Sequence, residues 1–374
     1  MQEFDAFLDD MRLQALAAGL PAESFAEWTA ALAPDDRVIQ RSANQPEHIR
    51  TASDYVSKLV SDARIAQGQG LQATHSKLLA RINDRYGVPA PILMAIWGIE
   101  SNYGQGIGTC SVLRSLATLA AMGGRRAGFW REQFLAALII LHRGDVTADQ
   151  LVGSWAAAMG QTQFMPTTYL EHAVDFDGDG RRDIWQSVAD ALASAANYLD
   201  AAGWIADVPW GWEVSLPAGF DYLLAGQDEP RPLAFWTGAG VLPATTSATN
   251  GQCTCTLVLP AGSAGPAFLA TPNFQCLLIY NNAMAYALSV GHLADRIAGL
   301  PPIAKEWPSE QPLDTEQRRE LQQRLVALGY DTGGVDGILG RASRRAVQKF
   351  QQHCDLVPDG YPNRVVLEEL RRTR

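Results

Sequence analysis

The spacing of apolar residues changes along the chain, and this change limits the possible folds more than any other feature of the sequence. Near the start, Phe4, Phe7 and Met11 recur at the spacing of one face of an amphipathic helix. Helical periodicity dominates as far as about Gly203, and it returns after Asn281. We therefore expect a mainly helical fold that begins with a helical region over residues 1–80.

One internal stretch has a different pattern. From residue 212 to about residue 280, glycine and proline interrupt short runs, and within it Cys253, Cys255 and Leu257 alternate with threonines. Alternation of this kind predicts strands, so we expect a small β-rich insertion in the helical fold. A proline-rich stretch, residues 301–314, then indicates a linker. A chain of 374 residues is too long for one ordinary core, which agrees with two or three domains.

The charge of the chain is unevenly distributed. The net charge is -10, which would repel a phosphate backbone, so nucleic acid is not an expected partner. Residues 315–374 carry 11 Lys and Arg against 8 Asp and Glu, a net charge of +3, so the remainder carries -13. This contrast indicates a separate C-terminal unit. No stretch has the roughly 18 consecutive apolar residues of a membrane span.

The first residues and the cysteines bear on the compartment. The chain opens with MQEFDAFLDD, which has neither the basic segment nor the apolar segment of an export signal. We therefore expect either a cytosolic protein or a mature form from which the signal has been removed. Five cysteines cannot all pair within one chain. Two alternatives stay open: the chain forms one disulfide among Cys253, Cys255 and Cys276, or these cysteines are free buried thiols.

Glu100 is the strongest candidate for an acid catalyst. Leu93, Ile96 and Glu100 recur at helical spacing, so the carboxyl group shares a helix face with apolar side chains. Burial would raise its pKa and keep it protonated for proton donation, although a buried glutamate paired with an arginine has the same pattern. The polar residues 101–104 end the helix, as expected where a helix terminus opens into a cleft.

No second acid accompanies Glu100. Glycosidases usually place two carboxylates beside the bond that they cleave. A single carboxylate suffices only if the substrate supplies its own nucleophile. The acidic residues between Glu100 and Val174, none of them in a comparable context, are Glu132, Asp145, Asp149 and Glu171.

The stretch that starts at Ser154 offers a second set of candidate site residues. Small residues there allow close backbone approach, while Gln163 supplies a hydrogen-bonding amide and Phe164 an apolar face, a combination that suits a sugar. A cluster of this kind that includes Met165 is also typical of an ordinary hydrophobic core, so both interpretations stay open.

An acidic loop comes after this stretch. Asp175, Asp177 and Asp179 occupy alternate positions of an EF-hand template, and hard oxygen ligands around a glycine turn are what Ca²⁺ requires. The last position of the template, normally glutamate, is glutamine here, so we expect a weak structural calcium site or a turn held by its own side chains. The predicted ligands are Asp175, Asp177, Asp179, Gln186 and the carbonyl group of Arg181.

Five motifs, in this order and spacing, resemble the B-type lytic murein transglycosylases over residues 1–300. They are IWGIESNYG at 96–104, AMGQTQFMPTTY at 158–169, DGDGRRDIW at 177–185, ALASAANYL at 191–199 and YNNAMAYAL at 280–288. The resemblance implies a lysozyme-like helical core with one catalytic glutamate that cleaves the MurNAc-β-1,4-GlcNAc bond of peptidoglycan. The position that matches this glutamate is Glu100.

The resemblance also implies a mechanism. Protonated Glu100 donates to the glycosidic oxygen, the N-acetyl group of MurNAc stabilises the cationic centre, and Glu100 then accepts the proton of the C6 hydroxyl. That hydroxyl attacks C1 and forms a 1,6-anhydro end. By the same resemblance Ser154 and Gln163 orient the acid or the N-acetyl group. The other predicted substrate-binding residues are Phe164, Met165, Tyr198, Tyr280, Asn281, Tyr286 and Tyr55.

The C-terminal residues resemble a three-helix peptidoglycan-binding module. Its motifs are LGY at 328–330, DGxxG at 336–340 and a helix that ends in Phe350 and Gln351. The leading hypothesis is thus a lytic transglycosylase with its own wall-binding module. A hydrolytic muramidase that cleaves the same bond and a catalytically idle wall-binding scaffold are the alternatives.

The complete prediction is a mainly α (α+β) protein with five parts. They are an N-terminal helical region at 1–80, a lysozyme-like core at 81–206 and 276–300, a β-rich insertion at 207–275, a linker at 301–314 and the module at 315–374. We expect peptidoglycan glycan strands as the partner, other cell-wall enzymes as further partners, and a monomer. We expect no required cofactor, and a structural calcium stays an open alternative. The expected location is the bacterial periplasm or cell envelope.

Overall fold

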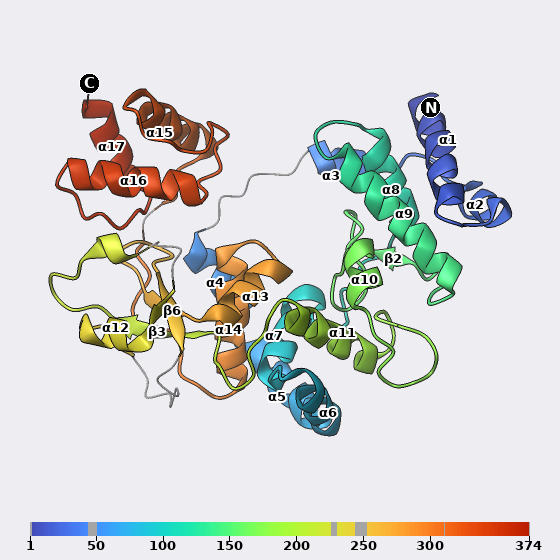
Figure 1. The fold of residues 1–374 in the computed structure, drawn as a ribbon, viewed down its shortest axis with the longest axis horizontal. Helices are drawn as coiled ribbons and strands as arrows, with labels where there is room; N and C mark the ends of the chain where they lie inside the picture. Colours follow the sequence, from blue (N-terminus) through green and yellow to red (C-terminus); the bar gives the residue numbers. More distant parts are fainter. Residues whose placement is uncertain (1, 44–50, 226–229, 244–252, 310, 374) are drawn as a thin grey trace. The chain divides into compact units, whose positions relative to one another are not determined.

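The computed structural model describes residues 2–43, 51–225, 230–243, 253–309 and 311–373. The chain forms two compact units (Figure 1). The first unit comprises Met1–Pro46 and Ala66–Ala201, and the second comprises Glu47–Ile65 and Ala202–Arg374. The predicted mainly helical fold is confirmed. Among the described residues, no helix is long and apolar enough to cross a membrane.

The first unit is built almost wholly from helices. The predicted N-terminal amphipathic helix is present, with Phe4, Phe7 and Met11 buried, and the ring of Phe7 meets that of Phe134 edge to face at 5.4 Å. A short pair of antiparallel strands joins Cys110–Ser111 (β1) to Val152–Gly153 (β2). The helices are α1 (Gln2–Ala17), α2 (Ala22–Thr29), α3 (Asp36–Ala43), α6 (Ser76–Tyr86), α7 (Ala90–Ser101), α8 (Val112–Ala121), α9 (Ala127–Arg143), α10 (Pro166–His172) and α11 (Val188–Ala201), while α5 (Asp62–Thr74) runs across the boundary in sequence.

Helix α7 is the central element of this unit. Pro91 lies in the first turn of α7, where a helix tolerates proline because the first N–H groups have no partner within the helix. Every residue from Ile92 to Gly98 is buried, because α6 and α11 pack against α7. Helix α6 stops at Gly87, because this glycine takes the left-handed conformation at φ +67°. Helix α7 ends at Ser101, where Asn102 takes the left-handed conformation.

The second unit contains the strands that the alternating pattern predicts. Five strands form one antiparallel sheet in the order β4-β6-β7-β3-β5. In β6, Cys255 and Leu257 are buried while Thr254 and Thr256, which alternate with them, are half-buried, because successive side chains of a strand point to opposite faces. The strands are β3 (Gly211–Ser215), β4 (Arg231–Pro232), β5 (Leu242–Pro243), β6 (Thr254–Val258) and β7 (Ala267–Ala270).

Helices pack around this sheet and beyond it. In α14, a Cβ on Gly291 would lie 2.3 Å from the indole ring of Trp210, so only glycine allows this contact. The Trp210 indole N–H donates to Asp295 at 3.1 Å. The helices of this unit are α4 (Ala52–Leu59), η1 (Tyr222–Leu224), α12 (Leu233–Gly238), α13 (Pro272–Tyr280), α14 (Met284–Ile297), α15 (Thr315–Ala327), α16 (Arg341–His353) and α17 (Arg364–Arg372).

Helices α15, α16 and α17 form a small domain with its own core. Leu321, Val347 and Phe350 are fully buried in it. The buried amide of Gln322 accepts from the Gly337 N–H at 2.7 Å and donates to Asp336 and to Ser343, so it orients the glycine-rich turn between α15 and α16.

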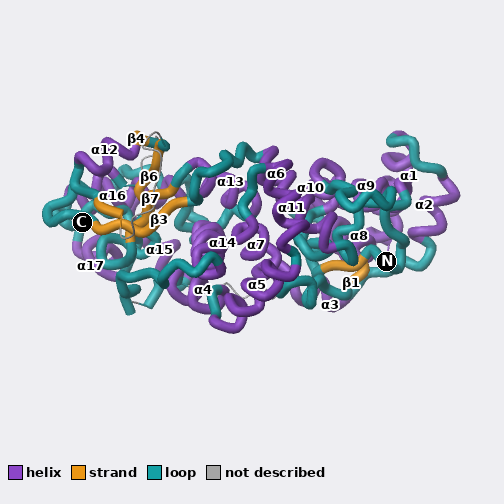
Figure 2. Tube along the Cα trace, turned by 90° about the horizontal axis from the view of Figure 1, so that it is seen from below, coloured by secondary structure: helices purple, strands orange, loops and turns teal. Residues whose placement is uncertain are grey.

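This domain is hydrogen-bonded to the β-rich part of the second unit, and Figures 1 and 2 show α15–α17 beside the strands. One carboxylate oxygen of Asp359 accepts from both the N–H and the hydroxyl of Ser263, each at 2.8 Å. The amide of Gln348 donates to the carbonyl groups of Tyr222 and Ala225. Three of these four hydrogen bonds have a main-chain group as one partner. Main-chain groups cannot move independently of the fold, so the bonds form only when the domain takes one defined position against the β-rich part.

Candidate active site

Glu100 lies at the C-terminal end of α7, one residue before the helix stops. It is half-buried. The helix ends with Ser101. The two residues after it, Asn102 and Tyr103, have φ angles of +49° and +58°, a conformation that non-glycine residues rarely adopt. Two such residues in succession turn the chain sharply away from the helix axis. The predicted polar end of this helix is therefore found, and the carboxyl group lies where the backbone changes direction.

Gln161 holds the end of α7 in place. Its side-chain oxygen accepts from the Trp97 indole N–H at 2.9 Å, and its amide nitrogen donates to the Trp185 carbonyl at 3.2 Å. The Ser101 hydroxyl donates to the Gln161 carbonyl at 2.7 Å and accepts from the Gly104 N–H at 3.0 Å. The residues on both sides of Glu100 are thus tied to the second sequence motif.

Gln161 is not among the predicted site residues. A glutamine next to small residues has no pattern that separates a buried structural amide from a ligand-binding one. Gln161 is only 4% exposed, whereas the predicted Gln163 is half-buried. Only the tertiary contacts distinguish the two.

Ser154 lies in a tight turn close to the backbone of another loop. Its hydroxyl accepts from the Ala158 N–H at 3.0 Å, and its own N–H donates to the Ala158 carbonyl at 2.8 Å. Ala157 has φ +64° within this turn. A Cβ on Gly108 would lie 2.1 Å from the Gly153 carbonyl oxygen, so the loop after Glu100 reaches Ser154 only because glycine stands there.

Gln163 is the fourth non-glycine residue of these segments with a left-handed backbone, at φ +52°. Its amide nitrogen donates to the carbonyl groups of Gly160 at 2.9 Å and of Ile107 at 3.3 Å. The structure therefore brings the segments of Glu100, Ser154 and Gln163 together. Four strained residues in these segments agree with a functional site, because such strain persists only where the surroundings impose it.

Phe164, Met165 and Tyr198 surround this group on the side of α10 and α11. Phe164 is buried and meets Tyr198 edge to face at 5.6 Å, so its ring belongs to the core that the sequence analysis left as an alternative. Tyr198 is half-buried and stacks on His172 at 4.6 Å, and burial raises its pKa. Met165 precedes the first turn of α10 and is half-buried.

The remaining predicted substrate-binding residues lie in the second unit. Tyr280, at the end of α13, stacks on Tyr286 of α14 with a centroid separation of 6.4 Å and an angle of 12°. Asn281 is exposed between these two helices. Tyr55 is half-buried on α4, which packs against α14. These four residues are thus carried by neighbouring helices of one unit.

The four other acids between Glu100 and Val174 have different surroundings. Glu132, Asp149 and Glu171 are exposed. Asp145 is buried, and its carboxylate accepts from both Arg182 Nε, at 3.2 Å, and Arg182 Nη2. The Asp145 carboxylate is therefore engaged in a buried ion pair.

The acidic loop gathers a different set of carboxylates from the one predicted. Oxygens of Asp175, Asp177 and Asp190 lie within 4.8 Å of one another. Asp190, in the first turn of α11, accepts from the N–H groups of Phe176 at 2.7 Å and Asp183 at 2.8 Å, and burial raises its pKa. The EF-hand template could not indicate Asp190 because this residue lies beyond its last position.

The other predicted calcium ligands are placed differently. Asp179 accepts from the Arg181 N–H at 2.9 Å and lies 3.7 Å from the Arg181 guanidinium. The side chain of Gln186 lines a neighbouring pocket instead. The carboxylates that the structure gathers thus include two of the three aspartates that the sequence predicted.

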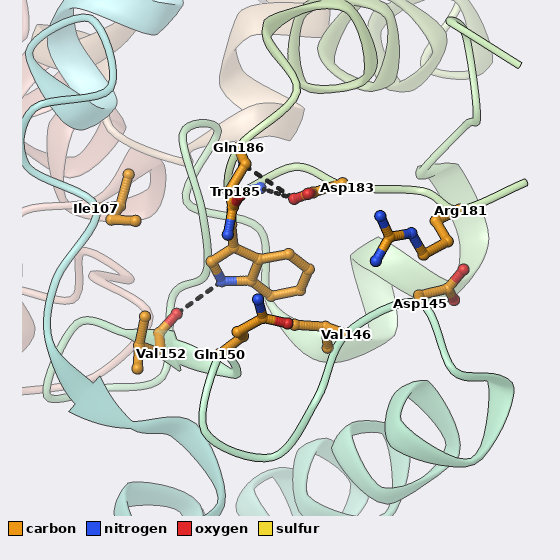
Figure 3. A pocket seen from close by; sticks show the side chains of 9 residues that line it. All are labelled: Ile107, Asp145, Val146, Gln150, Val152, Arg181, Asp183, Trp185 and Gln186. Atoms are coloured by element: carbon orange, nitrogen blue, oxygen red, sulfur yellow. Dashed lines mark hydrogen bonds between the residues drawn. The ribbon is translucent and has the colours of Figure 1, made fainter. Parts of the chain in front are cut away.

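This neighbouring pocket has a volume of about 260 Å³ (Figure 3). The indole of Trp185 forms one wall and donates to the Val152 carbonyl at 2.8 Å, while the guanidinium of Arg181 points toward it. Because Val152 precedes the Ser154 turn and Ile107 accepts from Gln163, the pocket adjoins the candidate site. Its lining residues are Ile107, Asp145, Val146, Gln150, Val152, Arg181, Asp183, Trp185 and Gln186.

Comparison with known proteins agrees with this geometry. The family model for the transglycosylase SLT domain matches residues 3–295, and that for a putative peptidoglycan binding domain matches residues 314–370. The chain is 31% identical over 249 residues to membrane-bound lytic murein transglycosylase B of Escherichia coli. This alignment covers 65% of the chain and 66% of that relative, just under two thirds of its length.

Two solved structures extend the comparison. SltB3 from Pseudomonas aeruginosa, in complex with NAG-anhNAM-pentapeptide, is 49% identical with a TM-score of 0.94, covering 99% of this chain and 100% of that one. The Escherichia coli lytic transglycosylase Slt35 in complex with calcium is 28% identical with a TM-score of 0.66, covering 79% and 92%. The protein therefore belongs to the transglycosylase SLT family, the lytic transglycosylases of peptidoglycan, and carries a peptidoglycan-binding domain after its transglycosylase domain.

Proposed function

We propose that the protein cleaves the MurNAc-β-1,4-GlcNAc bond of peptidoglycan and leaves 1,6-anhydro-MurNAc ends, with Glu100 acting first as acid and then as base. The observation that carries the proposal is a single half-buried carboxyl group at the end of α7, with the residues on either side tied by Gln161. The partial negative charge at the C-terminal end of a helix favours the protonated form of a carboxyl group there. This suits a proton donor.

The steps begin from this protonated state. Glu100 protonates the glycosidic oxygen as the bond to C1 breaks, and the MurNAc N-acetyl oxygen stabilises the cationic carbon. Ionised Glu100 then takes the proton of the C6 hydroxyl, whose oxygen forms the new bond to C1. Glu100 ends as it began, protonated. The engagement of Asp145 with Arg182 supports a mechanism without a second carboxylate.

Ser154 and Gln163 position the reacting groups in this proposal. The Ser154 hydroxyl accepts a bond from the Ala158 N–H, and a hydroxyl that accepts can still donate, here toward the Glu100 carboxylate. The Gln163 amide nitrogen already donates to two carbonyl groups, which leaves its oxygen to accept the N–H of the N-acetyl group. In the first unit the half-buried Met165 and Tyr198 contact the glycan strand, while the buried ring of Phe164 supports Tyr198. In the second unit the expected glycan contacts are Tyr55, Tyr280 and Asn281, and the buried Tyr286 supports Tyr280.

The substitution Glu100→Gln tests the mechanism. We expect loss of anhydro-muropeptide release from sacculi by at least about a hundredfold, which is the low end of what a general acid and base contributes. Mass spectrometry of the released fragments measures it, and sacculus pull-down should be unchanged. Glu132→Gln, on the exposed face of α9, is the matched control and should retain activity.

Two results would contradict the proposal. Fragments with reducing ends and no anhydro ends would indicate a hydrolytic muramidase. Wild-type protein that binds sacculi without releasing fragments would indicate a wall-binding scaffold.

We further propose that residues 315–374 bind peptidoglycan and that the protein works in the bacterial periplasm or cell envelope. The family match at residues 314–370 supports the first statement. A chain that ends at residue 309 should bind sacculi more weakly than the full chain while its turnover of soluble fragments changes less. Equal binding would argue against this role. A monomeric state and association with other cell-wall enzymes stay predictions.

We also propose a structural Ca²⁺ held by Asp175, Asp177 and Asp190. Clustered carboxylate oxygens are ligands that Ca²⁺ prefers, and a cation would favour the ionised form of Asp190, which burial disfavours. Millimolar Ca²⁺ should raise the melting temperature of the wild type more than Mg²⁺ does, but should not raise that of Asp190→Asn. An equal response of both proteins would reject the site.

A further inference from the structure

Two cysteine thiols lie next to each other at the start of β6. The Sγ atoms of Cys253 and Cys255 are 3.9 Å apart. Because the two residues are two positions apart along an extended chain, their side chains project from the same face. Cys255 is 1% exposed, and Cys253 is half-buried against the same cluster of apolar side chains. The transglycosylase chemistry uses neither thiol.

The surrounding hydrogen bonds hold this pair in place. The Cys253 carbonyl accepts from the Leu233 N–H at 3.0 Å, and the Cys255 carbonyl accepts from the Trp236 indole N–H at 3.0 Å. Helix α12, which contains Leu233 and Trp236, thus fastens the backbone on both sides of Thr254. The pair is part of the folded sheet.

The other buried thiol nearby in sequence has different contacts. Cys276 of α13 donates to the carbonyl group of Ala202 at 3.4 Å and lies 3.7 Å from that of Pro272. All five cysteines are free thiols in the structure. Of the three cysteines that the sequence left as disulfide candidates, proximity therefore selects Cys253 and Cys255.

We propose that Cys253 and Cys255 form a reversible disulfide by exchange with a low-molecular-weight disulfide, such as oxidised glutathione. The thiolate of Cys253 attacks one sulfur of the oxidant and expels the first thiol, which leaves a mixed disulfide. The thiolate of Cys255 then attacks Cys253 Sγ and expels the second thiol. The protein loses two hydrogens and two electrons, and the oxidant is reduced to two thiols.

The exposure of the two residues sets the order of the steps. Cys253 is reached first because it is the more exposed of the pair. Burial raises the pKa of the Cys255 thiol, with a further contribution from neighbouring Cys253, so the second step is the slower one at neutral pH.

Strand geometry makes this bond easy to reverse. Two residues of extended chain span about 6.6–6.8 Å between Cα atoms, which is the upper end of the separation that a disulfide tolerates. Closing the bond must therefore shorten the chain at Cys253 and draw its carbonyl away from the Leu233 N–H. Strained disulfides are the readily reduced ones. The pair acts as a redox switch on the contact between β6 and α12.

The first experiment equilibrates the full chain in glutathione buffers from fully reducing to fully oxidising, then applies alkylation and mass spectrometry. We expect the peptide with both cysteines to become two hydrogens lighter under oxidising conditions and to recover under reducing ones. The number of free thiols should fall from five to three. Cys276→Ser should behave in the same way, while Cys255→Ser should stop at the mixed disulfide.

The second experiment measures amide hydrogen exchange at Leu233, which should become faster in the oxidised protein. The double variant Cys253→Ser with Cys255→Ser should show no dependence on the buffer there. Alkylation of all five thiols at every glutathione ratio, or pairing of Cys253 with Cys276, would overturn the proposal. Unchanged exchange at Leu233 in a protein that forms the bond would overturn the switch.

Discussion

Gln161 allows a quantitative test of how the fold positions Glu100. The substitution Gln161→Ala removes an acceptor from the Trp97 indole N–H and a donor from the Trp185 carbonyl, both in buried surroundings. Each polar group left unsatisfied costs about 1–3 kcal/mol. Together they should destabilise the first unit by about 2–6 kcal/mol. For a cooperative unit of this size, that loss lowers the melting temperature by roughly 4–24 °C.

The same substitution should lower catalysis without weakening substrate binding. Gln161 is a positioning residue, because its side chain acts through Trp97 on the helix that carries Glu100, while its main-chain carbonyl, which alanine retains, still accepts from Ser101. A displacement of a reacting group by about 1 Å can cost about a hundredfold in rate. We expect kcat for anhydro-muropeptide release to fall by about ten- to a hundredfold, with KM changed by less than about threefold. Calorimetry and release kinetics on soluble glycan fragments measure the two effects.

Two further variants separate hydrogen bonding from packing. Gln161→Met retains the length of the side chain and removes both hydrogen bonds, so it should resemble the alanine variant. Gln40→Ala changes an exposed glutamine of α3 in the same unit and should alter stability by less than about 0.5 kcal/mol. A methionine variant with the stability and kcat of the wild type would refute the role given to these bonds.

Three further predictions concern the second unit. Asp359→Ala removes the two bonds to Ser263, so amide exchange at Ser263 should rise by about tenfold or more. Gly291→Ala, whose Cβ would lie 2.3 Å from an indole ring, should cost about 1–3 kcal/mol in thermal unfolding. Burial raises the pKa of Asp295 to about 7, so the stability that Asp295 contributes falls as pH rises from about 4 to 7. Burial lowers the pKa of His292 to about 4, so the stability that His292 contributes rises between about pH 4 and 6.5. The two slopes oppose each other in the wild type, and Asp295→Asn should therefore gain up to about 3 kcal/mol between pH 4 and 6.5 in melting experiments.

Each of these predictions has a result that contradicts it. Exchange at Ser263 that stays slow in Asp359→Ala would mean that other contacts hold the domain. An alanine at position 291 without loss of stability would mean that the indole ring has room to move. A pH profile of Asp295→Asn that matches the wild type would show that the carboxyl group titrates near its ordinary pKa.

The mainly helical fold class and much of the secondary structure could be predicted from local pattern. Apolar spacing identified the first helix and the strand that contains Cys255, because burial of one face repeats with the period of each element. Gly87 ends one helix and Pro91 lies in the first turn of the next, and both residues act on their own backbone angles. Glu100 could be selected for the same reason: its apolar helix and polar exit are neighbours in sequence.

The supporting residues could not be predicted in this way. Gln161 bonds to Trp97, 64 positions away, and Asp359 bonds to Ser263, 96 positions away. Asp190 joins Asp175 only because the loop folds back on the first turn of α11. Such partners leave no periodic trace in the sequence.

The sequence by itself determined the mainly helical fold, the presence of strands around Cys255, the family and the carboxylate to which we assign the chemistry. These depend on residues that act on their immediate neighbours or recur as motifs. The tertiary structure decided which amide holds the end of α7, which carboxylates gather at the acidic loop and which two thiols lie within reach of each other. The physical reason is that hydrogen bonds and ion pairs depend on distances of a few ångströms, which only the packing of distant segments sets.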